Sequence, residues 1–263
     1  MIDKHSASGN GTGQKTQKDR RKRIIRLLAI GSVSFGITIW GAVLLGWPAM
    51  QESVLTRTDV EVGKQSRQLV VILHAYMLGW SSLADLKREV KAVLPDADIL
   101  IPQYDSSPFS DADILQIASH LEALIDETVQ RRAANSGGRL QYERVILIGH
   151  SVGALLVRKA YLYGRGSTED HPINRGPTHP HSWVRKVDRI ILMAGMNRGL
   201  SLSPKPKNMK WYKYVISKLG ILIGRLTGTG KLIRSVERGS PFVANLRVQW
   251  IRLAHKRGDP APQ

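Results

Sequence analysis

The amino-acid sequence predicts an α/β domain with a predominantly parallel sheet, helices on both faces of that sheet, and one transmembrane helix before it. Short apolar runs rich in Val, Ile and Leu alternate with helical patterns from residue 69 onward, which is typical of parallel sheets. A serine between two glycines joins one such run to a helix. Before the domain, an uncharged apolar stretch is long enough to cross a bilayer.

The first of these elements to appear in the chain is the membrane segment. Residues 1–23 predict a basic, disordered tail, and residues 24–47 predict a signal-anchor helix. The run Leu27–Trp47 holds 21 residues without a charge, and at about 1.5 Å per residue it spans about 31 Å, one hydrocarbon core. A cleavable signal peptide is the alternative, but the run is longer than a usual h-region and no small-x-small cleavage site follows Trp47.

Flanking charge predicts the orientation of this helix. Residues 1–26 carry eight Lys or Arg against two Asp or Glu. The positive-inside rule then places the tail in the cytoplasm and the domain on the non-cytoplasmic side of the membrane, as a single-pass protein. Residues 48–66 are polar and are predicted to form a linker to the domain at residues 67–263.

Strands and helices follow from hydrophobic periodicity. Strands have β-branched apolar runs, and helices have apolar residues at intervals of three and four. Right-handed crossovers place the carboxyl ends of the parallel strands at one edge of the sheet, where ligands bind in such folds. The expected strands are 69–74, 98–102, 144–149 and 188–194, and the expected helices are 82–94, 111–132, 152–163 and 246–253.

The most informative motif is the pentapeptide Gly149-His150-Ser151-Val152-Gly153. It follows strand 144–149 and opens helix 152–163, which is the context of a G-x-S-x-G nucleophile elbow. The two glycines let strand and helix approach closely, and the serine takes a strained backbone conformation that exposes its hydroxyl. We therefore predict that Ser151 is a catalytic nucleophile.

With this motif, the sequence resembles the α/β-hydrolase superfamily, in particular its lipase- and esterase-like members, over residues 67–255. The segment ending in His74-Ala75-Tyr76 resembles the strand and oxyanion turn of that family. The resemblance implies an oxyanion hole formed by the backbone N–H groups of Val152 and Tyr76, and an ester or lipid substrate. We expect no cofactor and no metal site, since the chain has no cysteine and its histidine-rich segment 164–186 is Pro-rich and irregular. It also implies that His150 lies beside the site rather than acting as the base.

The resemblance further requires a histidine base and an acid after the serine. His255 is the sole histidine after residue 195, and the two strands expected to carry the acid and the base are not found. The sequence thus predicts a domain that is incomplete at its C-terminus. Two functions stay open: a membrane-anchored serine ester hydrolase with His255 as base, and a truncated or non-catalytic hydrolase-fold binding protein tethered to the membrane.

The charge of the chain indicates which classes of partner to expect. The net charge is +18, and residues 151–263 hold 21 basic against five acidic residues. Such a surface favours anionic lipid, while specific nucleic-acid binding is not expected because no recognition motif accompanies the charge. A lid insertion is predicted at about 196–245, which covers an acyl pocket, lies on an anionic bilayer, or packs as a helical cap on its own domain.

Overall fold

The computed structural model describes residues 55, 57–61, 65–107, 110–167, 180–201 and 226–255, together with single residues between 210 and 222. The predicted tail and signal-anchor helix lie outside these residues. Within the part of the chain that is described, no helix combines the length and the apolar character needed to span a bilayer.

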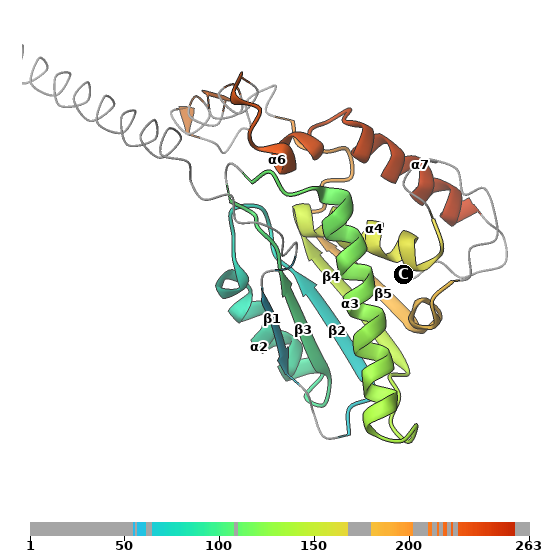
Figure 1. The fold of residues 1–263 in the computed structure, drawn as a ribbon. Helices are drawn as coiled ribbons and strands as arrows, with labels where there is room; N and C mark the ends of the chain where they lie inside the picture. The colour runs from blue at the N-terminus through green and yellow to red at the C-terminus, as the bar shows by residue number, and fades with distance from the viewer. Residues whose placement is uncertain are drawn as a thin grey trace, which may run out of the picture. The chain divides into compact units, whose positions relative to one another are not determined.

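One mixed sheet organises the described part of the domain (Figure 1). Its strand order is β1-β3-β2-β4-β5. Strand β1 pairs antiparallel with β3, and the other neighbouring strands pair in parallel. This arrangement confirms the predicted α/β class with a predominantly parallel sheet. The strands are β1 Arg57–Glu61, β2 Gln68–Leu73, β3 Asp98–Gln103, β4 Arg144–His150 and β5 Val187–Met193.

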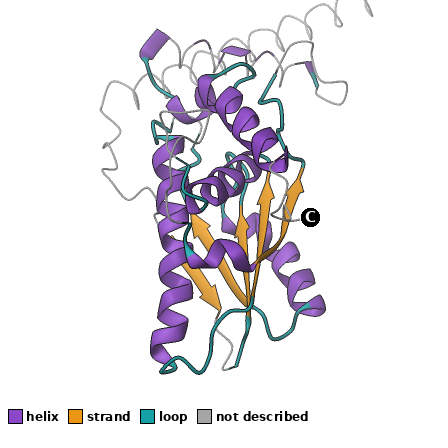
Figure 2. Ribbon diagram, turned by 90° about the vertical axis from the view of Figure 1, so that its right-hand side faces the viewer, coloured by secondary structure: helices purple, strands orange, loops and turns teal. Residues whose placement is uncertain are grey.

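Helices cover both faces of the sheet, as Figure 2 shows. Because side chains alternate along a strand, Leu69 and Val71 of β2 face one layer, and Val70 and Ile72 face the other. The first layer contains α3, α4, α6 and α7, and the second contains α2. The helices are α2 Ala84–Val93, α3 Ile114–Asn135, α4 Val152–Gly164, α6 Lys231–Ser235 and α7 Pro241–His255.

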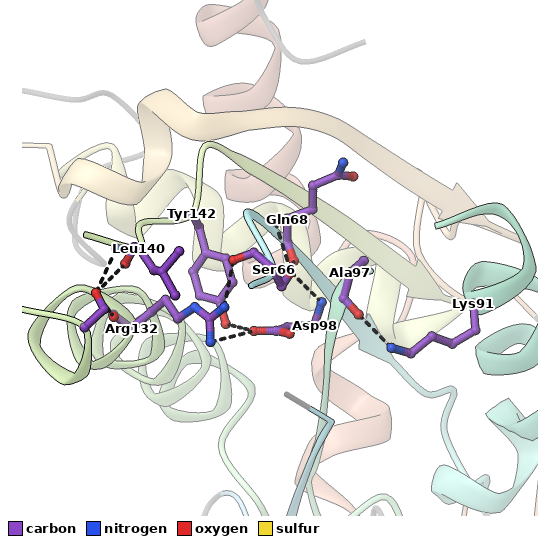
Figure 3. Close-up of polar contacts among 9 residues, drawn as sticks. Ser66, Gln68, Lys91, Ala97, Asp98, Arg132, Leu140 and Tyr142 are labelled. Carbon is purple, nitrogen blue, oxygen red and sulfur yellow. Dashed lines mark hydrogen bonds and ion pairs between the residues drawn. The ribbon is translucent and has the colours of Figure 1, made fainter. Parts of the chain in front are cut away.

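A buried polar network fixes the edge of the sheet where β2 and β3 begin (Figure 3). The Asp98 carboxylate is fully buried and accepts a hydrogen bond from the hydroxyl of Tyr142. Arg132 of α3 lies 4.0 Å from the same carboxylate and donates to the carbonyl of Ser66 at 3.0 Å. These bonds tie α3 and the start of β4 to the sheet, and they lie at the edge opposite the carboxyl ends of the parallel strands.

The prediction that 48–66 is a linker is wrong for residues 57–61, which form β1. The segment Arg-Thr-Asp-Val-Glu has no apolar alternation, so it carries no local strand signal. Its conformation comes from pairing with β3, in a register that places Arg57 opposite Gln103 and Glu61 opposite Ile99.

The predicted lid at 196–245 extends too far at its C-terminal end. Leu232 and Val236 are fully buried, and Phe242 and Val243 of α7 also belong to the main core cluster. The segment 232–246 therefore contributes apolar side chains to the domain core. The basic residues interspersed among them made this stretch resemble a surface insertion. Helix 246–253 is confirmed as part of the longer α7.

Candidate active site

Ser151 lies at the carboxyl edge of the sheet, between β4 and α4, in a strained backbone conformation. Its φ is 55° and its ψ is −112°, a region that residues with a side chain rarely occupy. Its backbone N–H donates to the carbonyl of Met193 at 2.9 Å, which fixes the turn against the end of β5. The structure thus places the predicted nucleophile in a sharp strand-to-helix turn with its side chain partly exposed.

The glycines of the motif are required by close packing. A Cβ at Gly149 would lie 2.5 Å from the carbonyl oxygen of Gly153, and a Cβ at Gly153 would lie 2.7 Å from the carbonyl oxygens of Leu73 and His74. Both distances are shorter than real contacts. Only glycine at both positions lets α4 begin this close to the end of β2.

The close approach of α4 to the end of β2 also bears on the two predicted oxyanion donors, the backbone N–H groups of Val152 and Tyr76. Val152 is the first residue of α4, where backbone N–H groups have no partner within the helix. Tyr76 lies in the turn after β2, directly beyond the His74 carbonyl that Gly153 approaches. The neighbouring Met77 holds this turn, with a φ of 60° and an N–H that donates to the Ser106 carbonyl at 2.8 Å.

Tyr76 and His74 differ in what they contribute to this turn. Burial, reinforced by the nearby Asp105 carboxylate, raises the pKa of Tyr76 to about 12, so its phenol stays neutral. The His74 side chain is almost fully buried, and its Nδ1 donates to the Ala75 carbonyl at 2.9 Å. Its ring stacks on Tyr104 at 4.2 Å, and the Tyr104 hydroxyl donates to the His74 carbonyl at 2.8 Å.

His74 therefore holds the turn in place through its ring and its backbone carbonyl. Its Nε2 has no hydrogen-bond partner among the described residues, and burial lowers the pKa of the imidazole. The neutral tautomer with the proton on Nδ1 fits both observations.

The Ser151 hydroxyl donates to the sulfur of Met196 at 3.3 Å, in the loop after β5. Sequence analysis missed this residue, because nothing in its type or spacing marks a methionine as a partner of a nucleophile. Within the described residues, no histidine or carboxylate forms a hydrogen bond with the Ser151 hydroxyl. His150 is half-buried beside it, and His255 is the last residue of α7, with a side chain outside the described residues.

Among the described residues, no three His, Cys, Asp or Glu side chains lie close enough together to hold a metal ion. The site consists of a strained serine, a helix N-terminus and a turn with backbone N–H groups. These are the parts that an acyl-transfer reaction needs for a nucleophile and an oxyanion hole.

No protein-family model matches the chain, and no curated protein matches it. Solved structures similar to it include the esterase PE8, at 21% identity over 40% of this chain and 56% of that one, with a TM-score of 0.30. A Bacillus licheniformis lipase in mature form has 15% identity over 73% and 64%, with a TM-score of 0.40. A Thermogutta terrifontis esterase has 11% identity over 60% and 54%, with a TM-score of 0.37.

The chain spans less than two thirds of the length of each of these three structures. Their TM-scores are below 0.5, so the assignment of the fold depends on the geometry of this chain itself. Its predominantly parallel sheet, its helices on both faces and its strained Ser151 between β4 and α4 fit the α/β-hydrolase type.

Proposed function

We propose that this protein hydrolyses a carboxylic ester through an acyl-enzyme formed on Ser151. The observation that carries the proposal is the backbone of Ser151, which is strained at φ 55° at the start of α4. Strain of this kind persists only where the surrounding structure imposes it, and it is concentrated at functional sites. Here it separates the serine hydroxyl from the sheet and directs it to the edge where ligands bind.

In the proposed reaction, Ser151 Oγ attacks the ester carbonyl and its proton passes to a base. The backbone N–H groups of Val152 and Tyr76 stabilise the oxyanion. The base then protonates the alcohol as the C–O bond breaks, leaving the acyl-enzyme. Water attacks this intermediate, and the carboxylic acid leaves as Ser151 regains its proton. We propose His255 as the base, at the end of α7.

A hydrophobic or lipid ester is the proposed substrate class. The described residues Trp211, Val215, Leu219, Leu222 and Leu226 are in helical conformation at intervals of four, four, three and four, and each is at least half exposed. Residues 198–238 hold ten Lys or Arg against one Glu. Exposed apolar residues among basic ones favour contact with an anionic bilayer. Together with the predicted anchor at 24–47, this supports a single-pass protein whose domain acts at the non-cytoplasmic membrane surface.

Hydrolysis of p-nitrophenyl esters with acyl chains of two to twelve carbons tests this proposal, using the full chain in nanodiscs. We expect turnover that Ser151→Ala lowers by at least about a thousandfold, and that Ser182→Ala, a matched change at an exposed serine, leaves intact. His255→Ala tests the base in the same assay. Turnover that survives Ser151→Ala, or a folded wild-type protein without turnover, would contradict the proposal.

The hydrogen bond from Ser151 to Met196 favours a second function. A serine hydroxyl that donates to a thioether is not activated, and no described base contacts it. The alternative is a membrane-tethered protein that binds esters at this site without cleaving them. In the same assay, this function predicts saturable ester binding with no release of p-nitrophenol.

A further inference from the structure

We propose that Met196 is an oxidation site through which a hydroperoxide lowers the reactivity of Ser151. The sulfur of Met196 lies 3.3 Å from the Ser151 hydroxyl and accepts the hydrogen bond that this hydroxyl donates. Conversion of the thioether to a sulfoxide replaces a weak acceptor with a polar oxygen. The inference rests on the nucleophilic role proposed for Ser151 and adds chemical control of that residue to it.

The composition of the chain directs a hydroperoxide to methionine. The chain has six methionines and no cysteine, the other side chain that such an oxidant attacks. Three of the methionines are described, Met77, Met193 and Met196. Of these three, Met196 accepts the hydrogen bond from the Ser151 hydroxyl. Its oxidation is therefore the one that acts directly on the nucleophile.

The loop after β5 is fixed at both ends, which keeps Met196 beside the serine. At its start, the carbonyl of Met193 accepts a hydrogen bond from the N–H of Ser151 at 2.9 Å. At its end, the N–H of Leu200 donates to the carbonyl of Val236 at 2.7 Å. These backbone bonds do not involve the side chain of Met196, so they remain when its sulfur is oxidised.

Oxidation of the sulfur is a two-electron step that hydrogen peroxide alone completes. Met196 is only partly buried, and its hydrogen bond uses one of the two lone pairs of the sulfur. The second lone pair attacks one peroxide oxygen, and the S–O bond forms as the O–O bond breaks. The proton of that oxygen passes to the departing hydroxide, which leaves as water. The sulfur is thus oxidised by two electrons and the peroxide is reduced by two.

The added oxygen changes what the serine hydroxyl contacts. Two hydroxyl-type oxygens joined by a hydrogen bond lie about 2.7 Å apart, so a sulfoxide oxygen does not fit on the line between two atoms that are 3.3 Å apart. Methionine has three rotatable bonds, which let its side chain turn and bring the new oxygen to the hydroxyl while the backbone stays in place. A sulfoxide accepts a hydrogen bond but is too weak a base to take the serine proton. The oxidised side chain therefore holds the Ser151 hydroxyl in an unreactive state.

Treatment of the full chain in nanodiscs with hydrogen peroxide, followed by fluorophosphonate labelling, tests the inference. Peptide mass spectrometry measures oxidation at each methionine and labelling at Ser151 in the same sample. We expect oxidation of Met196 to slow labelling about fivefold, the effect of one hydrogen bond of ordinary strength, in a protein that stays folded by circular dichroism. Unchanged labelling after oxidation of Met196, a Met196 that is not oxidised in the folded chain, or a loss of labelling that accompanies unfolding would overturn the inference.

Substitutions of the methionines locate the effect, with each variant compared with its own untreated sample. Met196→Leu cannot form a sulfoxide, so peroxide should leave its labelling rate unchanged. Met193→Leu and Met77→Leu, at exposed side chains, should lose reactivity on treatment as the wild type does. Met196→Gln carries an amide oxygen on a side chain of similar length and should slow labelling about fivefold without peroxide. A peroxide effect that persists in Met196→Leu would show that the site lies elsewhere.

The untreated sample separates failure of this inference from failure of the proposed hydrolysis. If the untreated wild-type protein is folded and is not labelled, Ser151 is not a nucleophile and both proposals fail. If the untreated protein is labelled and oxidation of Met196 has no effect, the proposed nucleophile stands and its control by Met196 is wrong.

Discussion

The hydroxyl of Ser151 donates a hydrogen bond to the sulfur of Met196 across 3.3 Å, which joins the turn after β4 to the loop after β5. Sulfur is a weak acceptor, so this bond holds the hydroxyl in one orientation without increasing its nucleophilicity. An attack on an ester requires the hydroxyl to leave this partner for a base.

Met196→Leu is therefore expected to increase the rate at which Ser151 reacts with a fluorophosphonate. The side chain keeps its size but loses its acceptor, and loss of a weak hydrogen bond corresponds to about a threefold rise in rate. Met193→Leu is the matched control, because its exposed side chain changes while its backbone carbonyl still accepts from Ser151. A lower rate in Met196→Leu would show that the sulfur positions the hydroxyl productively.

Gly153→Ala should destabilise the fold and abolish reaction at Ser151. The added Cβ would lie 2.7 Å from the backbone oxygens of Leu73 and His74, so either β2 or α4 must move. Overpacking of this kind costs about 1–3 kcal/mol, measurable by urea unfolding. Gly79→Ala places a Cβ in open space and should change the free energy of unfolding by less than about 0.5 kcal/mol. Equal effects of the two substitutions would contradict the close approach at the elbow.

His74 should make the domain sensitive to acid. Burial lowers its pKa below the ordinary 6.5, so below that pH the unfolded chain binds the proton more readily than the folded one. The contribution of His74 to the free energy of unfolding is therefore complete above pH 6.5. It decreases as the pH falls from 6.5 toward the pKa of the folded state, by at most about 1.4 kcal/mol per pH unit.

His74→Phe keeps the ring stack on Tyr104 and removes the titration. The decline in the free energy of unfolding below pH 6.5, followed by urea titration at several pH values, should be shallower than in the wild type. His120→Phe, at an exposed position of α3, should leave the decline unchanged. If the free energy of unfolding of His74→Phe declines below pH 6.5 as steeply as that of the wild type, the decline does not come from His74.

Tyr142→Phe should lower the free energy of unfolding by about 1–3 kcal/mol, because the fully buried Asp98 carboxylate loses a hydrogen-bond donor. Glu143→Gln serves as control at the next residue. It weakens the exposed ion pair with Arg67, and such pairs contribute about 0–1 kcal/mol. Thermal unfolding of both variants measures the difference, and a smaller effect for Tyr142→Phe would contradict a stabilising role of the network.

Much of the fold follows from local patterns in the sequence. The apolar runs of β2, β3 and β4 are buried strands, and the run of β5 marks a strand that is only partly buried. The start of α4 follows from the elbow. Strand β1 carries no such pattern because it pairs at the edge through its backbone. Its polar sequence is typical of a linker, and only the pairing with β3 determines its conformation.

The site was predictable only in part, for a related reason. A G-x-S-x-G motif reports its own backbone geometry, so the strain at Ser151 and the packing at Gly149 and Gly153 follow from the sequence. The contact of Ser151 with Met196 depends on how the loop after β5 folds back, and no local pattern encodes it.

Fluorophosphonate labelling of the full chain, followed by mass spectrometry of the peptide that contains Ser151, tests the central claim most directly. The account predicts a phosphonylated Ser151 in the wild type and no labelling in Ser151→Ala, with Ser182→Ala labelled as the wild type is. Circular dichroism of the same preparation shows whether the wild-type protein is folded. If it is folded and Ser151 stays unlabelled, the claim that Ser151 is a nucleophile is contradicted.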